Sequence, residues 1–345
     1  MEIRVMDGGL LTTVQDLGRF GYQLSGISAA GPMDSRSFRI ANLLVGNGEN
    51  AAALEATIMG PRLEMTADTV FAVTGGDLQP ALNGRSLPMY RAIRAGAGDV
   101  LSFRGIRTGC RAYVAFSGGI DVPEVLGSRS TLVRAGFGGY EGRRLQKGDT
   151  LKVFDAPLPR NLEARAVPPE DFSAREVTLR VIMGPQDDRF TEKGIETFLS
   201  TPYTVTDQFD RMGCRFEGEK IEHLTDANII SDGIALGAVQ VPGSGLPIIM
   251  AAERQPTGGY TKIASVCSVD MSRLGQCKAG DAVRFERIGI HEAQDLYLAE
   301  RAKLEERRQA FAKAETAPAP AGKRKEYRIT LGGVSYAVTV EEADS

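Results

Sequence analysis

The chain has 345 residues, of which 42% are hydrophobic and 25% are charged, as in folded globular proteins of about two domains. Its 41 Lys and Arg residues are balanced by 44 Asp and Glu, so the net charge is −3, which argues against nucleic acid as a partner. No apolar run approaches the roughly 18 residues of a membrane span. The first residues lack the apolar segment and cleavage site of a secretory signal. We therefore expect a cytoplasmic protein that binds no membrane.

Metal and nucleophile chemistry have few residues to draw on. Only two histidines occur, His223 and His291, so a His-rich metal site or a Ser-His relay has few candidates, and we predict no metal. The nearest G-x-G-x-x-G string begins at Gly136 and has Glu141 in place of its last glycine, so a dinucleotide fingerprint is not supported. No C-x-x-C pair is present, and the cysteines are expected to be free thiols. They are Cys110, Cys214, Cys267 and Cys277.

Short β-branched runs separated by paired glycines predict a mostly β protein of the barrel or sandwich kind. Three Gly-Asp turns that each feed an alternating strand, at 98–99, 148–149 and 280–281, indicate two related lobes. Gly-Asp is also simply a favoured hairpin turn, which leaves this duplication open. The predicted strands cover residues 69–74, 110–117, 177–183, 237–241, 247–251 and 263–269.

The segment 157–175 is rich in Pro, Ala and charge and has no clear periodicity, so we interpret it as a linker. It would separate an N-terminal lobe, 1–156, from a C-terminal lobe, 176–289, which contains the proposed site.

Helices are predicted to be few. Asp34 and Ser35 are suited to cap a helix that ends at Gly46, and a second helix is expected over 193–199. A third, highly charged helix covers 290–315, with an apolar residue every seventh position. Such a stripe usually docks on its own domain, and a partner helix is the alternative. The stripe consists of Ile290, Tyr297, Leu304 and Phe311.

The last part of the chain, 316–345, is predicted to be a linker followed by a β-hairpin. Residues 316–322 (TAPAPAG) suit an extended linker, and 327–340 contain two alternating strands joined at Gly332 and Gly333. Since an isolated hairpin is marginally stable in water, this tail is a plausible contact element for another chain.

One dense polar segment, 240–263, is the first candidate for a site. Within it, Thr257, Gly258 and Gly259 form a predicted turn whose backbone N–H groups can approach a ligand closely, while Arg254 and Lys262 can balance an anion. The alternative is a hairpin whose polar residues only face water.

A second candidate segment, 207–218, places Arg211 beside Asp210. An arginine can clamp a carboxylate or phosphate with two hydrogen bonds. By spacing alone, a surface ion pair that fixes a turn is equally good.

Several motifs resemble the biotin-dependent carboxyltransferase family. This family includes the C subunit of 5-oxoprolinase, allophanate hydrolase subunit 2, the carboxyltransferase region of urea carboxylase and the antagonist of a sporulation kinase inhibitor. The similarity covers about residues 1–288, in the same order along both lobes. The motifs are 9–22 (GLLTTVQDLGRFGY), 31–35 (GPMDS), 41–46 (ANLLVG), 54–55 (LE), 119–123 (GIDVP), 126–131 (LGSRST), 184–186 (GPQ), 210–213 (DRMG), 240–242 (QVP) and 255–260 (QPTGGY).

The resemblance implies two cyclophilin-like β-barrel lobes and chemistry on an amide, with the site in the cleft where the lobes meet a partner subunit. Negative charge that develops on an amide oxygen would need hydrogen-bond donors. The resemblance implies catalytic roles for Arg211, Tyr260 and Lys262, with the arginine and lysine as anion anchors and the tyrosine as an oxyanion donor. The substrate-binding residues would be Gln240, Thr257, Gly258 and Gly259.

The resemblance also implies a multi-subunit enzyme with a companion subunit and a small amide substrate. The first hypothesis is a 5-oxoprolinase type of ATP-dependent lactam hydrolysis. The second is carboxyl transfer from carboxybiotin on a separate carrier protein, because this chain has no Met-Lys dipeptide to biotinylate, although 325–340 resembles the opening strands of a carrier domain. The third is a regulatory partner without enzymatic activity. A cofactor-binding residue is not assigned.

Overall fold

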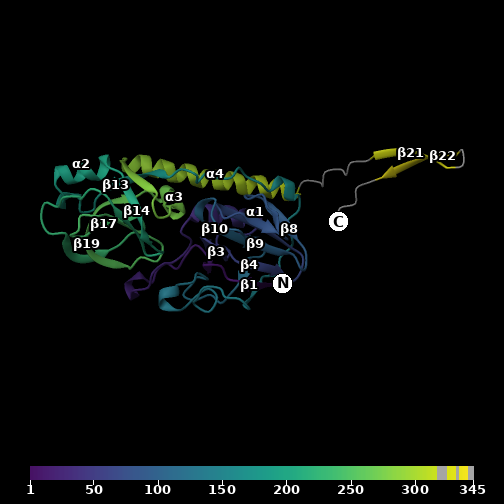
Figure 1. Ribbon diagram of the computed structural model, residues 1–345, viewed down its shortest axis with the longest axis horizontal. Helices are drawn as coiled ribbons and strands as arrows, with labels where there is room; N and C mark the ends of the chain where they lie inside the picture. The colour runs from purple at the N-terminus through teal and green to yellow at the C-terminus, as the bar shows by residue number, and fades with distance from the viewer. Residues whose placement is uncertain (317–324, 332–333, 341–345) are drawn as a thin grey trace.

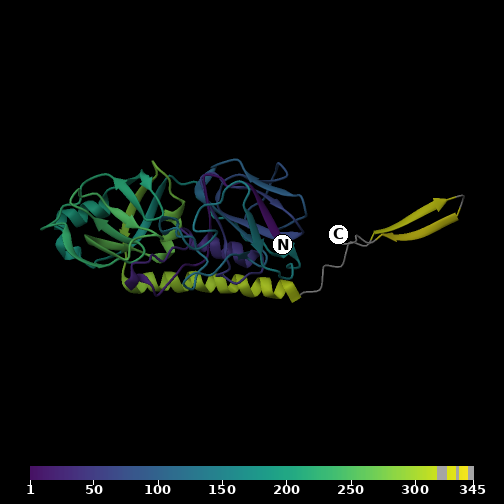
Figure 2. The same cartoon turned by 90° about the horizontal axis from the view of Figure 1, so that it is seen from below.

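Two β lobes lie side by side, and one long helix runs along both of them (Figures 1 and 2). This computed structural model describes residues 1–316, 325–331 and 334–340. The sheets of the first lobe use only strands before residue 154, and the sheet of the second uses only strands from residue 176 to 287. The predicted mostly β fold with barrel lobes is confirmed.

The first lobe consists of two sheets packed face to face. Its core includes Ile3, Leu63, Val73 and Val114, which come from both sheets. One sheet has the strand order β11 (Ile120–Asp121), β12 (Thr150–Val153), β1 (Glu2–Asp7), β4 (Arg62–Met65), β9 (Val100–Phe103), β6 (Pro80–Leu82) and β7 (Arg85–Ser86). The other has the order β2 (Leu11–Gln15), β3 (Ala53–Thr57), β10 (Thr108–Phe116), β5 (Thr69–Asp77) and β8 (Ala92–Ala95).

The central strands of the second sheet are apolar on both faces. In β5 the run from Thr69 to Gly76 is buried throughout, because one face meets the lobe core and the other meets α1 (Ser35–Leu44). A strand covered on both sides reads as a continuous apolar run rather than an alternating one. Helix α1 begins as predicted, with the Asp34 side chain accepting a hydrogen bond from the N–H of Ser37 at 2.9 Å.

The second lobe is a closed barrel. Its eight-stranded sheet begins with β13, and a further pairing of β13 with β19 closes a ring that leaves only β16 outside. Strands β13 and β20 pair in parallel, and the other neighbours pair antiparallel. The order is β13 (Glu176–Met183), β20 (Ala282–Arg287), β14 (Tyr203–Phe209), β15 (Gly213–Glu217), β18 (Ile248–Met250), β17 (Ala238–Val241), β19 (Thr257–Val266) and β16 (Asn228–Gly233).

Two short helices accompany this barrel. Helix α2 (Glu192–Ser200) is capped by the Thr191 side chain, which accepts from the N–H of Gly194 at 2.9 Å. Helix α3 (Met271–Gln276) packs its Leu274 into the barrel core. The predicted strand over 263–269 ends earlier than expected, because β19 ends at Val266 and a 3-10 turn over Ser268–Asp270 leads into α3.

Residues 157–175, interpreted from the sequence as a linker, run along the first lobe before β13 begins. The backbone of Arg165 accepts from the N–H of Ala92 at 2.9 Å, and the N–H of Val167 donates to the backbone oxygen of Tyr90 at 2.9 Å. The Arg165 guanidinium is buried and lies over the Phe311 ring. This stretch therefore extends the edge of β8 and fills the space under the long helix.

The long helix is α4 (Ile290–Thr316), and it joins the end of the second lobe to the first lobe (Figure 2). The predicted apolar stripe docks along half of its length. Leu304 and Phe311 are buried against α1 and its neighbours, whereas Ile290 and Tyr297 remain about half exposed. The ion pair of Arg36 with Glu300 holds α1 against the polar side of α4.

Beyond α4, β21 (Lys325–Leu331) and β22 (Val334–Val340) pair antiparallel, as the alternating pattern predicted (Figure 1). The connection at Gly332 and Gly333 and most of the predicted linker lie outside the described residues. Within the described part of the chain, no helix has both the length and the apolar character required to cross a membrane.

Candidate functional site

A cavity of about 500 Å³ lies in the second lobe, bordered by strands β14, β15, β17, β18 and β19. It contains two of the residues predicted from sequence, Gln240 and Tyr260. Gln240 comes from β17 and Tyr260 from β19, two strands that pair within the barrel. The remaining lining residues are Asp207, Gln208, Phe209, Asp210, Met212, Gly213, Arg215, Ile248, Met250 and Gln255.

Two buried polar atoms at this cavity have no hydrogen-bond partner within the described structure. They are the Nε2 of Gln240, a side chain that is only 2% exposed, and the Oε1 of Gln255. Burying an amide group without a hydrogen bond costs free energy, so folded proteins seldom leave such groups unpaired. Of five cavities formed by the described residues, this is the one whose lining includes such atoms.

Gly258 creates the space between these two side chains. A Cβ atom at this position would lie 2.6 Å from Ile234 Cδ1, 3.0 Å from Gln240 Nε2 and 3.6 Å from Gln255 Nε2. A side chain here would therefore occupy the region that both glutamine amides border. The glycine keeps this region open.

The predicted turn at Thr257–Gly259 is instead the beginning of strand β19, which is a correction of the sequence interpretation. Gly258 pairs with Asp232 and Thr257 with Gly233 of β16. The glycines do not break the strand here, because the neighbouring β16 supplies a hydrogen-bonding partner. Thr257 and Gly259 do not line the cavity, so their role in substrate binding stays a prediction.

Tyr260 lies at the rim, with 41% of its surface exposed. Its hydroxyl makes no hydrogen bond within the described chain and is available to a ligand. Elsewhere on the lining, Asp210 holds its own loop by accepting from the N–H groups of Met212 at 2.7 Å and Gly213 at 3.1 Å. Its carboxylate and that of Asp207 outnumber the single cation of the lining, Arg215.

Lys262 is not part of the cavity wall. Its side chain is 3% exposed and its Nζ forms an ion pair with Asp232. Gln186 connects the two residues, because its Nε2 donates to Asp232 at 3.1 Å and its Oε1 accepts from the N–H of Lys262 at 3.0 Å. The structure therefore pairs the lysine with a carboxylate of this chain, and its catalytic role as an anion anchor stays a prediction.

Arg211 lies between the two lobes, adjacent to the cavity in sequence but behind its wall. Its guanidinium contacts Glu55 and Gly31 of the first lobe and Glu253 of the second, with 2.6 Å from Nη2 to the Gly31 oxygen and from Nε to the Glu253 carboxylate. Burial disfavours the charge, but the two carboxylates more than offset this and raise the pKa of Arg211. Its catalytic role stays a prediction, and the structure adds a role in joining the lobes.

We call this group, Arg211 with Glu55, Glu253 and Tyr113, the inter-lobe cluster. Glu55 also accepts from the Tyr113 hydroxyl at 2.7 Å and from the N–H of Met33 at 2.8 Å. Burial, followed by the nearby charge of Glu55, raises the pKa of Tyr113 well above its usual value. The charged groups of the cluster thus find their partners within the protein.

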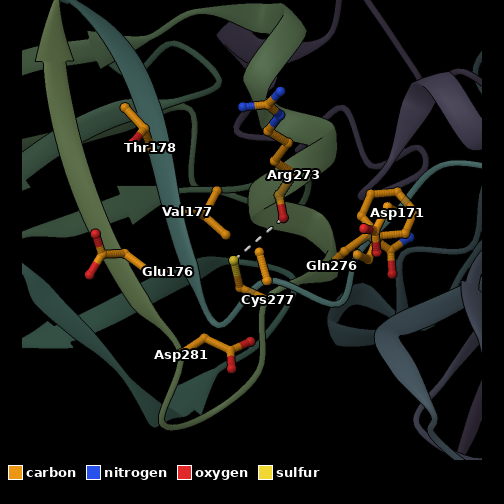
Figure 3. Close-up of a pocket in the computed structure, with 10 residues that line it drawn as sticks. Asp171, Glu176, Val177, Thr178, Arg273, Gln276, Cys277 and Asp281 are labelled. Carbon is orange, nitrogen blue, oxygen red and sulfur yellow. Dashed lines mark hydrogen bonds between the residues drawn. The ribbon is translucent and has the colours of Figure 1, made fainter.

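A second cavity, of about 350 Å³, lies where residues 171–178 pass α3 (Figure 3). Two of its polar groups already have partners in the chain. Asp281 is paired with Lys278, and the Cys277 thiol donates to the backbone oxygen of Arg273 at 3.4 Å. Burial raises the pKa of Cys277 to about 12, which keeps it a neutral thiol. This cavity therefore offers less to a polar ligand than the one at Gln240.

Sequence reasoning missed three residues that shape the site. Gln255 belongs to the QPTGGY motif but was not assigned a role, although an amide side chain beside the candidate glycines was a usable signal. Asp232 and Glu253 become relevant only when β16 and the lobes are brought together. They are far from their partners in sequence, so no local pattern could pair them.

Two lobes of this kind, with a polar cavity in the second, define a carboxyltransferase type of domain. The chain belongs to the carboxyltransferase domain family, subdomains A and B, which matches residues 25–287. The resemblance inferred from its motifs is thereby confirmed.

Similar proteins include bacterial and yeast relatives. The chain is 37% identical over 291 residues to the C subunit of 5-oxoprolinase from Escherichia coli (strain K12), covering 84% of this chain and 93% of that protein. It is 34% identical over 323 residues to urea amidolyase of Lachancea kluyveri, covering 87% of this chain and 18% of that protein. The crystal structure of Kluyveromyces lactis urea carboxylase matches with a TM-score of 0.82 and 30% identity, over 99% of this chain and 32% of that one. The chain thus spans a third or less of these two yeast proteins.

Proposed function

We propose that this chain is a subunit of a multi-subunit enzyme that hydrolyses a small lactam, in the manner of the C subunit of 5-oxoprolinase. The observation that carries this proposal is the cavity with two unpaired carboxamide atoms, because the C=O and N–H of a lactam can satisfy both. The identity to the bacterial subunit over almost its whole length supports the same assignment.

Hydrolysis of a lactam places negative charge on the carbonyl oxygen as the ring carbon is attacked. Gln240 and Tyr260 both line this cavity, and the Gln240 Nε2 and the Tyr260 hydroxyl are the hydrogen-bond donors that we assign to this oxygen. Donors fixed in position before the reaction lower its barrier more than water does, since they need no reorganisation. Their assigned roles are substrate binding for Gln240 and oxyanion stabilisation for Tyr260.

The cavity does not fit a triphosphate. Two carboxylates, Asp207 and Asp210, face a single cation, Arg215, and this balance repels a polyanion. We therefore assign ATP to a companion subunit rather than to this chain. The partner would be the second carboxyltransferase-like subunit of a hetero-oligomer.

The test is ATP-dependent conversion of 5-oxoproline to glutamate by this chain purified together with its companion subunits. Tyr260→Phe removes one donor and is expected to lower kcat by about a hundredfold, with assembly unchanged in gel filtration. Tyr297→Phe, a matched change at an exposed tyrosine on α4, is expected to retain full activity. Wild-type turnover by the Tyr260 variant would contradict the assignment.

A second candidate function is carboxyl transfer from carboxybiotin on a separate carrier protein to an amide or urea nitrogen. The match of urea carboxylase to 99% of this chain favours it. The two candidates are separated by incubating the complex with ATP, bicarbonate and urea and probing the co-purified proteins with avidin. A biotinylated partner together with urea-dependent ATP consumption would show that the complex catalyses carboxyl transfer rather than lactam hydrolysis.

A further inference from the structure

The two unpaired atoms at the cavity are of opposite kinds. Gln240 offers an N–H donor through Nε2, and Gln255 offers an acceptor through Oε1. A ligand that satisfies both must present an acceptor and a donor together. A ligand that presents only acceptors leaves the Gln255 oxygen unpaired and adds repulsion to it.

The two carboxamides also border one small region. Their nitrogens lie 3.0 Å and 3.6 Å from the position that a Gly258 Cβ would take. The Oε1 of Gln255 is bonded to the same carbon as its nitrogen, so the donor and acceptor that the ligand presents must lie close together on one side of the molecule. Widely separated groups would not reach both side chains.

We propose that this cavity selects the edge of a cis amide, in which the C=O and the N–H point to the same side. The carbonyl oxygen accepts from Gln240 Nε2, and the N–H donates to Gln255 Oε1. A lactam ring and a urea both carry this edge. An ordinary peptide bond is trans, so its C=O and N–H point in opposite directions and it fits poorly.

This inference rests on the proposed function and adds a substrate class to it. When the C–N bond of a lactam is cleaved by water, the carbon becomes a carboxylate and the nitrogen becomes an ammonium group. The cis edge is then lost, and the carboxylate brings a second acceptor toward Gln255 Oε1. The cavity therefore distinguishes the substrate from its own hydrolysis product.

The same edge occurs in the ureido ring of biotin, so the ligand chemistry has two possible sources, a small substrate or the biotin of a carrier. Binding to the full chain is measured by calorimetry with 2-pyrrolidinone, urea and biotin. N-methyl-2-pyrrolidinone, which lacks the N–H, and γ-butyrolactone, which replaces it with oxygen, are the matched negative probes. Tighter binding of biotin than of the two small probes identifies the carrier as the source.

We expect the N–H lactam to bind at least about tenfold more tightly than its N-methyl and lactone analogues. Equal binding of the three rings, or binding of none of the probes, would overturn the proposal. This comparison uses only the wild-type chain, so it does not depend on how any variant folds.

Two variants with the same change in charge sharpen the test. Gln255→Glu keeps an acceptor and is expected to weaken lactam binding less than Gln240→Glu does. At pH 8, Gln240→Glu replaces the donor with an acceptor facing the carbonyl and is expected to weaken binding at least about tenfold. Gln23→Glu, outside the cavity, controls for the added charge. A glutamate at this position can still accept the hydrogen bond that the N–H of Gly21 donates to Gln23 Oε1. Equal loss in both cavity variants would contradict the assigned directions.

The result of the binding test can be distinguished from the result of the hydrolysis assay that tests the proposed function. If ring selectivity is observed but the complex does not hydrolyse 5-oxoproline, the cis-amide site stands and lactam hydrolysis fails. If hydrolysis proceeds while the chain does not distinguish the N-methyl ring, the inference fails and the proposed function stands.

Discussion

At the scale of single residues, Gly258 is required for space rather than for backbone conformation. It lies in strand β19, and the atoms nearest to an added Cβ are the far ends of two flexible side chains, Ile234 and Gln240. These side chains can move, so Gly258→Ala is expected to fold normally. The added methyl group would nevertheless fill the region between the glutamine amides.

We therefore predict that Gly258→Ala lowers lactam turnover by at least about tenfold while the melting temperature changes by only a few degrees. Steady-state kinetics of the complex and thermal unfolding of the chain measure the two effects. Gly233→Ala, on the neighbouring strand and with open space around its Cβ, is the control. A large loss of stability without a separate loss of activity would show that the glycine serves the fold.

The four cysteines are buried, and for each of them desolvation by burial raises the pKa. Only the thiolate is nucleophilic, so we predict that native protein at pH 8 reacts slowly with a thiol reagent, and that guanidinium exposes four reactive thiols per chain. Absorbance after addition of an aromatic disulfide measures this. One thiol that reacts at once in the native state would contradict the burial.

The raised pKa values of the cysteines also predict in which direction the free energy of unfolding changes with pH. Between the unfolded pKa, about 8.5, and the higher folded pKa, the unfolded chain loses thiol protons that the folded chain retains. Stability is therefore expected to be unaffected by the cysteines below about pH 8 and to fall as the pH rises above about 9.

At the scale of elements, the local sequence pattern was sufficient to predict α1, α4 and most of the strands. Asp34 caps its helix as the sequence indicates, and the strand predicted over 177–183 is present as β13. The Thr257–Gly259 segment was misjudged, because two glycines favour a turn locally while pairing with the distant β16 makes a strand. Among the site residues, Gln240 and Tyr260 were found from their motif, but the pairing of Lys262 with Asp232 depends on long-range packing.

The stripe of α4 allows a matched comparison on one element. Leu304 is 2% exposed and packs against α1, whereas Leu298 is 62% exposed. We predict that Leu304→Ala lowers the free energy of unfolding by about 2–5 kcal/mol and that Leu298→Ala changes it by less than about 0.5 kcal/mol. Urea unfolding followed by circular dichroism measures both. Equal effects would mean that α4 does not depend on this contact with the first lobe.

At the scale of the whole molecule, the inter-lobe cluster makes the two lobes one unit. Removing the Arg211 guanidinium would leave the buried carboxylates of Glu55 and Glu253 without the cation that pairs with both of them. We predict that Arg211→Ala lowers the free energy of unfolding by about 3–5 kcal/mol. Denaturant titration measures it, with the exposed Arg62→Ala as a control that is expected to change stability by less than about 1 kcal/mol.

The Arg211 measurement also separates two roles for this residue. If Arg211→Ala unfolds at the wild-type denaturant concentration yet abolishes turnover, the arginine acts on the substrate as the family resemblance implied. If stability falls and turnover recovers when the variant is assayed well below its unfolding transition, its role is to hold the lobes.

The course of α4 determines where a polypeptide that follows Thr316 would begin. The helix leaves the barrel that contains the cavity and, over 27 residues, or about 40 Å, carries the chain to the far side of the first lobe (Figure 2). A module fused after Thr316 would therefore begin far from the cavity of the second lobe. To bring a bound group to this cavity, such a module would need a long flexible linker. Otherwise it would have to reach the cavity of a second molecule.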